Sequence, residues 1–311
     1  MSSALRDHGG GLDAAARRYG GSRSDWIDLS TGINPAPYPV GTFQAEDWTA
    51  LPDAGAFRRL EAAARSFWRV PADAGVLAAP GASALIARIP ALFSQSSVDI
   101  PAPTYNEHAA AFRAHGWSVD DSADLRVIVH PNNPDGRFWD ASDLRTATII
   151  DESFCDIAPA RSLIDLAGRP GTIVLKSFGK FWGLAGLRLG FAIGDPTLIA
   201  KLRDFIGPWA VSGPALRIGA TALEDHAWAS ATRERLTRDA ARLDRVMLAH
   251  GADIAGGTPL FRLYDTASAQ QMQDKLARAH IWSRIFPYSE RWLRLGLPPA
   301  DGWDRLKDAL A

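Results

Sequence analysis

Two hydrophobic patterns alternate along the first two thirds of the chain. Behind Asp53, a candidate helix cap, Phe57, Leu60, Ala64 and Phe67 recur at helical spacing, which predicts an amphipathic helix. The second pattern is a short apolar run, rich in β-branched residues and bounded by turn residues, which is typical of a strand buried on both faces. Such runs lie at 98–100, 117–119, 125–129, 148–150, 172–175 and 189–193.

Helices are predicted between these runs, at 83–93 and 105–115, although Pro90 weakens the second half of the first one. Alternating strands and helices predict an α/β fold with a mainly parallel sheet and helices on both faces. The Gly/Pro-rich segment "GPWAVSGP" at 207–214 marks a boundary. Beyond it we expect two long helices, at 214–230 and 231–250, and then an α+β pattern.

This change of pattern predicts two domains. The large α/β domain is expected at 45–210. A small α+β domain is expected from 1–44 together with 211–311.

Polar and aromatic groups follow the predicted strands, where ligands of open α/β sheets bind. Asp151 ends one strand, and a carboxylate there needs a positive charge or hydrogen-bond donors. Asn133 lies in an Asn-Pro-Asp-Gly sequence that could equally form a plain β-turn. Lys180 is flanked by Phe181 and Trp182, and an apolar setting lowers the pKa of a lysine and makes it a better nucleophile.

A candidate phosphate site comes from "PGASAL" at 80–85, where Gly81, Ala82 and Ser83 begin a predicted helix. The alternative is a simple helix cap. Together these groups suit a ligand with a phosphate, an aldehyde, a basic ring nitrogen and a flat face. Pyridoxal 5′-phosphate (PLP) has all four.

Composition excludes several other functions. The net charge of −1 gives no electrostatic footprint for nucleic acid, and no apolar run reaches the ~18 residues of a membrane span. Cys155 is the only cysteine, which excludes an intramolecular disulfide and fits a reducing, cytoplasmic location; we expect it to be a small buried hydrophobe. The seven histidines lack metal-ligand spacing, so no metal is predicted, and His108 and His115 are expected on a polar helix face.

Four motifs, in this order, carry a family resemblance: "PAPTYNEH", "HPNNPDG", "DESF" and "SFGKFWGLAGLRLGFAIG". They resemble the fold-type I PLP-dependent enzymes, the aspartate aminotransferase superfamily. The chain is most similar there to histidinol-phosphate aminotransferases and to the L-threonine-O-3-phosphate decarboxylases of cobalamin (vitamin B12) biosynthesis. The N-terminal "DHGGGLDAAARRYG" and "WIDLSTGINPAPYP" resemble the decarboxylases, and the likeness extends from residue 7 to about 297.

The resemblance implies a role for each matching residue of the cofactor site. Lys180 forms the covalent link to PLP, Asp151 pairs with the pyridine nitrogen, and Asn133 donates to the ring oxygen. Tyr105 stacks on the ring. The cofactor phosphate is held by Ser177, Arg188 and the backbone of Gly81, Ala82 and Ser83.

The resemblance also implies substrate contacts. Arg294 matches the arginine that binds the substrate carboxylate, a task that suits a bidentate guanidinium. Arg284 matches a position that binds substrate phosphate. His8, Gly9, Gly10 and Asn34 lie in N-terminal segments that fold over the active site. A homodimer is implied as well, because the subunits of this family share their active sites.

Two positions depart from the family pattern. Phe154 replaces a tyrosine that usually bonds the ring oxygen, and the decarboxylases tolerate phenylalanine there. Leu51 stands where a tyrosine usually reaches the partner's cofactor phosphate, so the source of that contact is open.

The resemblance favours PLP-dependent decarboxylation of a small phosphorylated amino acid, L-threonine O-3-phosphate, to (R)-1-amino-2-propanol O-2-phosphate. An aminotransferase of the histidinol-phosphate type is the alternative, because both reactions use the same motif residues. A regulatory protein on the same fold is a third interpretation, but the N-terminal residues contain no helix-turn-helix pattern.

Overall fold

A five-stranded sheet forms the centre of the larger of the two compact units into which the chain divides. The computed structural model describes residues 8–94 and 96–311. The larger unit consists of residues 37–133 and 137–231. The smaller unit contains the described residues up to 36, residues 134–136 and residues 232–311. The boundary that the sequence suggests near 210 falls just before α7 (Gly213–Glu224), which packs along α3 (Ala54–Trp68) inside the larger unit.

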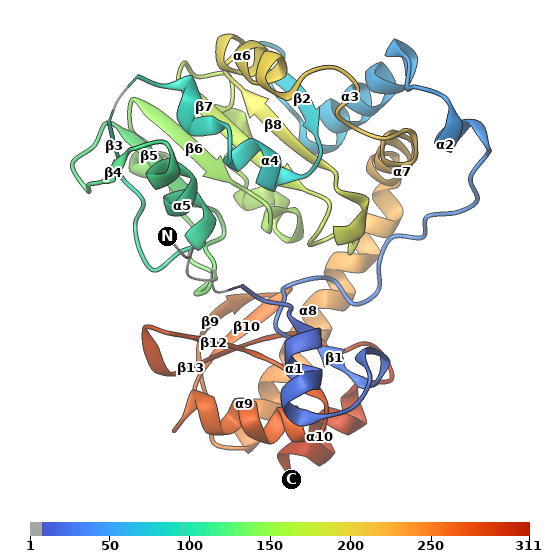
Figure 1. Ribbon diagram of the computed structural model, residues 1–311, viewed down its shortest axis with the longest axis vertical. Coiled ribbons are helices and arrows are strands. Elements are labelled where there is room, and N and C mark those ends of the chain that lie inside the picture. Colours follow the sequence, from blue (N-terminus) through green and yellow to red (C-terminus); the bar gives the residue numbers. More distant parts are fainter. Residues whose placement is uncertain (1–7, 95) are drawn as a thin grey trace. The chain divides into compact units, whose positions relative to one another are not determined.

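The strands of the central sheet follow the order β2-β8-β7-β6-β5 (Figure 1). Their bounds are Gly75–Ala79 for β2, Leu125–Val129 for β5, Ala147–Asp151 for β6, Thr172–Ser177 for β7 and Gly190–Gly194 for β8. Strands β5, β6 and β7 are parallel, and β8 runs antiparallel to β7 and β2. The predicted α/β fold with a mainly parallel sheet is therefore confirmed. Strand β2 is not predicted from the sequence, because GVLAA has only one β-branched side chain.

The carboxyl ends of β2, β5, β6 and β7 lie along one edge of this sheet, because β2 and β7 both run antiparallel to β8. The register pairs Val129 with Asp151, and Gly190 with both Ser177 and Ala79. The polar segments that follow these strands are thereby brought to the same edge.

Helices α4 (Ala82–Ile86) and α5 (Asn106–Ala114) lie in front of the sheet in Figure 1. The single helix predicted over 83–93 is wrong: α4 ends early and a 3₁₀ turn, Ile89–Leu92, follows. Pro90 explains the break, because it has no N–H and its ring hinders a continuing α-helix.

Helix α3 matches its prediction. The Asp53 side chain accepts hydrogen bonds from the backbone N–H groups of Gly55 (2.9 Å) and Ala56 (3.2 Å), and Leu60 and Ala64 are buried. Helices α2 (Glu46–Thr49) and α6 (Pro196–Ile206) complete the larger unit together with a two-stranded sheet of β3 (Ser97–Val98) and β4 (Ser118–Val119). The runs at 98–100 and 117–119 thus form this small separate sheet, which touches β5 through an isolated bridge between Asp99 and Arg126.

The smaller unit is built on a four-stranded antiparallel sheet in the order β12-β13-β10-β9. These strands are β9 Asp253–Thr258, β10 Phe261–Asp265, β12 Arg284–Phe286 and β13 Ser289–Gly296, and the helices include α1 Leu12–Tyr19, α9 Ala269–Arg278 and α10 Trp303–Leu310. Near the N-terminus, β1 (Ile27–Asp28) pairs in parallel with β11 (Ile281–Trp282), which joins the two ends of the chain within this unit.

Helix α8 (His226–Ala249) begins in the larger unit and continues in the smaller one. The two long helices predicted after 213 are therefore α7 and α8, with their break at Asp225 rather than near 230. Within the described ranges, no helix combines the length and the apolar character that crossing a membrane requires.

Candidate active site

The Asp151 carboxylate lies at the carboxyl end of β6 and is almost completely buried. Nε2 of His108 is 2.8 Å from one oxygen, and Ser153 donates its backbone N–H (3.0 Å) and its hydroxyl (2.5 Å) to the other. Burial alone would raise the pKa of Asp151. The hydrogen bond and electrostatic effect of His108, with the two bonds from Ser153, outweigh burial and hold this pKa below its ordinary value. The expectation that a carboxylate here needs donors is confirmed.

His108 corrects one sequence-based expectation. Only 1% of the His108 surface is exposed, so His108 does not lie on a polar helix face. His115, at the C-terminal end of α5, is exposed. The His108 ring meets that of Tyr105 edge-on, with the centroids 6.0 Å apart. Spacing along α5 could not reveal its role, because its partner Asp151 lies 43 residues away in the sequence.

Lys180 lies in the loop that follows β7. This loop is closed by two backbone hydrogen bonds, from Gly183 to the Lys180 carbonyl (3.1 Å) and from Leu184 to the Phe178 carbonyl (3.0 Å). The Lys180 Nζ atom is 5.2 Å from the centre of the Phe154 ring, three residues beyond Asp151. The half-buried lysine is therefore held near the end of β6, as the convergence of strand ends predicts.

The candidate phosphate residues meet at the start of α4. Gly81 has a φ of +87°, and a Cβ there would lie 2.6 Å from a guanidinium nitrogen of Arg188. A Cβ on Gly190 would lie 2.5 Å from the backbone nitrogen of Ala82. Ser177 pairs with Gly190 across β7 and β8. The backbone of β8, the arginine and the first amides of α4 thus approach closely because two glycines leave room.

The loop that carries Tyr105 is fixed by Asn132, a residue that the sequence analysis does not single out. Its side chain accepts a hydrogen bond from the Thr104 hydroxyl (2.6 Å) and donates one to the Pro103 carbonyl (3.0 Å). Asn133, which follows it, is half-buried. The turn after β5 and the loop before α5 are therefore joined at the same sheet edge as Asp151.

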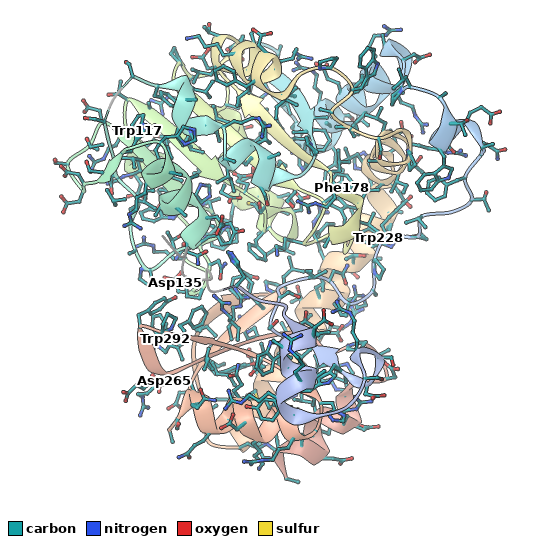
Figure 2. All side chains as sticks on the ribbon, viewed as in Figure 1. Trp117, Asp135, Phe178, Trp228, Asp265 and Trp292 are labelled. Atoms are coloured by element: carbon teal, nitrogen blue, oxygen red, sulfur yellow. The ribbon has the colours of Figure 1, made fainter. Side chains whose placement is uncertain are left out.

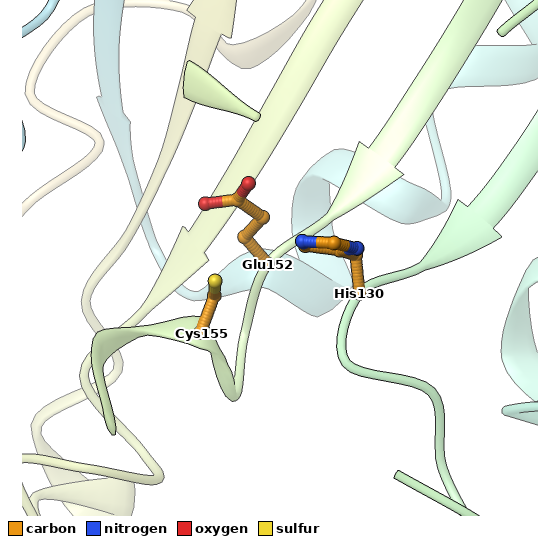
Figure 3. A group of neighbouring side chains, drawn as sticks. All are labelled: His130, Glu152 and Cys155. Carbon is orange, nitrogen blue, oxygen red and sulfur yellow. The ribbon is translucent and has the colours of Figure 1, made fainter. Parts of the chain in front are cut away.

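A second buried polar cluster lies beside this edge. The candidate ligand atoms of His130, Glu152 and Cys155 all lie within 4.8 Å of one another (Figure 3). Both nitrogens of His130 are engaged, however: the Trp139 N–H donates to Nδ1 (3.1 Å), and Nε2 donates to the Arg161 carbonyl (2.6 Å). Burial lowers the pKa of His130 and raises that of the buried Cys155 thiol well above its ordinary value.

Lys176 supplies the positive charge of this cluster. Its Nζ atom is 2.5 Å from Glu152 and 3.6 Å from Asp156. Burial would lower the pKa of Lys176, but these two carboxylates raise it above its ordinary value, so the lysine is charged. An ammonium group and hydrogen bonds thus satisfy the groups that a metal would need, and the absence of a metal stays a prediction.

The candidate substrate residues belong to the smaller unit. Arg284 of β12 and Arg294 of β13 are direct cross-strand partners. Arg294 is buried, donates to the Ser30 carbonyl (2.6 Å) and lies over the Phe261 ring (5.2 Å).

The N-terminal candidates are held by the same unit. Gly9 packs so tightly that a Cβ would lie 2.5 Å from the Ser30 carbonyl oxygen. The Gly10 N–H donates to the Ser30 hydroxyl (2.6 Å). Asn34 is buried and accepts a hydrogen bond from Arg235 (2.6 Å), whereas His8 is exposed.

The His108–Asp151 contact predicts a pH-dependent stability. His108→Leu, measured by urea unfolding without added cofactor, is expected to lower the free energy of unfolding at pH 7 by about 2–4 kcal/mol. In the wild type the pKa of Asp151 is lowered, so its ionised form stabilises the fold above about pH 4, and this contribution is lost as the pH falls through the lowered pKa. Without His108, burial raises that pKa, so the gap between the two proteins narrows as the pH falls towards 4.

His115→Leu on the same helix is the matched control, and it is expected to change the free energy of unfolding by less than about 0.5 kcal/mol. A gap that does not vary between pH 4 and 8, or equal losses in both variants, would show that His108 does not stabilise the Asp151 carboxylate.

Known proteins place this arrangement in a family. The family model described as aminotransferase class I and II matches residues 120–310. The threonine-phosphate decarboxylase of Sinorhizobium sp is 40% identical over 98% of this chain and 97% of that protein, and the threonine-phosphate decarboxylase of Pseudomonas aeruginosa is 39% identical over the same shares. A solved structure of histidinol-phosphate aminotransferase from Sinorhizobium meliloti, in complex with pyridoxal-5'-phosphate, has the same fold, with a TM-score of 0.83 at 19% identity over 100% of this chain and 98% of that one. The chain therefore belongs to the aminotransferase class I and II family.

Proposed function

We propose that this protein is a PLP-dependent enzyme that decarboxylates L-threonine O-3-phosphate to (R)-1-amino-2-propanol O-2-phosphate, a step of cobalamin biosynthesis. The observation that carries the proposal is the 40% identity to a threonine-phosphate decarboxylase over nearly the whole length of both chains. The motif residues alone do not choose between decarboxylation and transamination, so the proposal depends on this similarity.

The residues present fit PLP. Asp151 is ionised in a buried setting, which suits a partner for a protonated ring nitrogen. Gly81 and Gly190 leave room for close backbone approach beside Arg188, which suits a phosphate. Lys180 supplies the amine near the Asp151 end of β6. When bound, PLP supplies an electron-withdrawing ring that stabilises negative charge at the substrate Cα.

Each residue then has a defined task. Asp151 keeps a proton on the ring nitrogen. Tyr105 and Asn133 orient the ring, and Ser177, Arg188 and the backbone of 81–83 hold the phosphate. Lys180 would hold the cofactor aldehyde, and its amine would move a proton at the substrate Cα. The substrate-binding residues would decide which bond at Cα is aligned for cleavage, so small differences in placement decide the reaction.

The arginine pair of the smaller unit supports an anionic substrate. Like charges directly opposite each other on a sheet are destabilising, and Arg284 and Arg294 are such a pair. Two guanidinium groups at adjacent positions attract anions. A substrate with one phosphate and one carboxylate supplies two anionic groups, with Arg284 assigned to the phosphate and Arg294 to the carboxylate. His8, Gly9 and Asn34 are assigned to the segment that covers this substrate.

The alternative is an aminotransferase of the histidinol-phosphate type. It is supported by the shared fold with the Sinorhizobium meliloti enzyme, at much lower sequence identity. The two functions differ in the bond that breaks at the substrate Cα: the bond to the carboxylate in decarboxylation, and the bond to hydrogen in transamination.

A cytoplasmic homodimer completes the proposal. Trp48 and Leu51 are 68% and 70% exposed, and large apolar side chains with such exposure suit burial by a second copy. Leu51 stands where the family's intersubunit tyrosine is expected. The single free cysteine, Cys155, fits a reducing compartment.

A product assay tests the proposed reaction. The PLP-loaded protein is mixed with L-threonine O-3-phosphate, with and without 2-oxoglutarate, and CO₂ and glutamate are measured. Release of CO₂ that is independent of 2-oxoglutarate is expected, and Lys180→Ala should abolish both this release and the visible absorption of the lysine-bound cofactor. Glutamate formation without CO₂ would instead establish the aminotransferase, and an unchanged spectrum in Lys180→Ala would refute the lysine assignment.

The arginine assignment predicts a substrate-specific loss. Arg284→Ala should raise KM for L-threonine O-3-phosphate about 30- to 100-fold, the equivalent of one or two charge-assisted hydrogen bonds, and change KM for L-threonine little. Arg291→Ala is the control, because this exposed arginine of the same sheet is paired with Asp265. Equal losses for both substrates would remove the phosphate role of Arg284.

A further inference from the structure

We propose that Asp156 is a positioning residue that holds the Lys180 loop through the indole of Trp182. The inference rests on the proposed function, because it concerns how the chain presents the lysine that PLP requires.

Asp156 is a buried carboxylate with two indole donors. Trp68 donates its Nε1–H to Oδ1 (2.8 Å), and Trp182 donates its Nε1–H to Oδ2 (3.0 Å). Lys176 adds a positive charge 3.6 Å away. Burying a carboxylate is costly unless its oxygens are satisfied, so the two indoles and the lysine maintain this group in the core. The carboxylate in turn fixes the position of both indoles.

The rings of Phe178 and Trp182, which flank Lys180 in the sequence, stack on each other. The Trp182 ring is fully buried and nearly parallel to the Phe178 ring, with an interplanar angle of 12° and centroids 5.2 Å apart. Its other stacking partner is Trp228, also at 12°, with centroids 5.3 Å apart. Figure 2 labels Phe178 and Trp228. Since Phe178 precedes Lys180 by two residues and Trp182 follows it by two, the stack holds the loop on both sides of the lysine.

Stacking and hydrogen bonding restrain different motions of Trp182. Contact between parallel rings fixes the plane of the indole but tolerates rotation and sliding within that plane. The hydrogen bond to Asp156 is directional, so it fixes this remaining freedom. Backbone bonds from Tyr38 N–H to the Trp182 carbonyl (2.9 Å) and from Leu184 N–H to the Phe178 carbonyl (3.0 Å) transmit this position to the main chain. Lys180 is thereby presented in one position beside Phe154.

The structure contains a matched control. Trp68 donates to the same carboxylate, but it ends α3 and is no part of the Lys180 loop. Trp68→Phe and Trp182→Phe each keep an aromatic ring and remove one indole N–H, and each leaves one oxygen of Asp156 without that donor. A purely structural role for Asp156 predicts similar effects of the two variants on Lys180, whereas a positioning role predicts different ones.

The experiment uses both variants and the wild type, reconstituted with PLP. Similar decreases of Tm are expected in the two variants. Only Trp182→Phe should slow covalent attachment of added PLP by about tenfold or more, and shift the midpoint of the pH titration of the visible absorption, because only it loosens the lysine. It should also lower kcat with little change of KM. Equal attachment rates and equal midpoints in the two variants would overturn the inference.

Two further measurements keep the outcomes separate. Asp156→Leu is measured beside these variants, because a leucine side chain can accept from neither indole, and it takes the place of Trp182→Phe if that variant does not fold. It should slow attachment as Trp182→Phe does, and a wild-type rate would overturn the inference. A different result would contradict the proposed function. It would fail if the wild type, after addition of PLP, showed no visible absorption band of bound cofactor, or if Lys180→Ala retained this band.

Discussion

Keeping the Asp151 carboxylate ionised away from water is the constraint on which the candidate site depends. A buried negative charge is costly, and here His108 and Ser153 together use both oxygens of the carboxylate. Their position follows from the fold: β6 ends at Asp151, Ser153 follows in the next turn, and α5 brings His108 to the carboxyl end of this strand. The strand, the helix and the turn therefore all contribute to stabilising the negative charge of Asp151.

The carboxylates of Asp151, the last residue of β6, and Glu152, the next residue, lie in two different environments. Asp151 meets α5, whereas Glu152 meets Lys176 of β7 and the backbone N–H of Leu163. This separation follows from the alternation of side chains along a strand. The Asp151 carboxylate is bonded to His108 and Ser153, and that of Glu152 joins the end of β6 to β7 through an ion pair whose loss would leave an uncompensated buried charge. The same buried cluster reaches Asp156 and, through Trp182, the loop of Lys180.

Local sequence patterns predict the parts of this site that follow strands. The apolar runs at 125–129, 148–150 and 172–175 became β5, β6 and β7, and Asp151 and Lys180 follow from what comes after them. The supporting contacts are different in kind. The sequence predicts a polar-face position for His108, because its partner Asp151 is distant in the sequence. The contacts of Asp156 with Trp68 and Trp182 can be identified only from the packed core. Periodicity describes one element at a time, whereas these contacts depend on how elements pack.

The most direct test of this account is a crystal structure of the protein loaded with PLP. The account predicts continuous density from the Lys180 Nζ atom to the cofactor, and the pyridine nitrogen within about 2.7–3.1 Å of the Asp151 carboxylate while His108 keeps its contact with the other oxygen. Attachment to another lysine, or a ring nitrogen that faces no carboxylate, would contradict it.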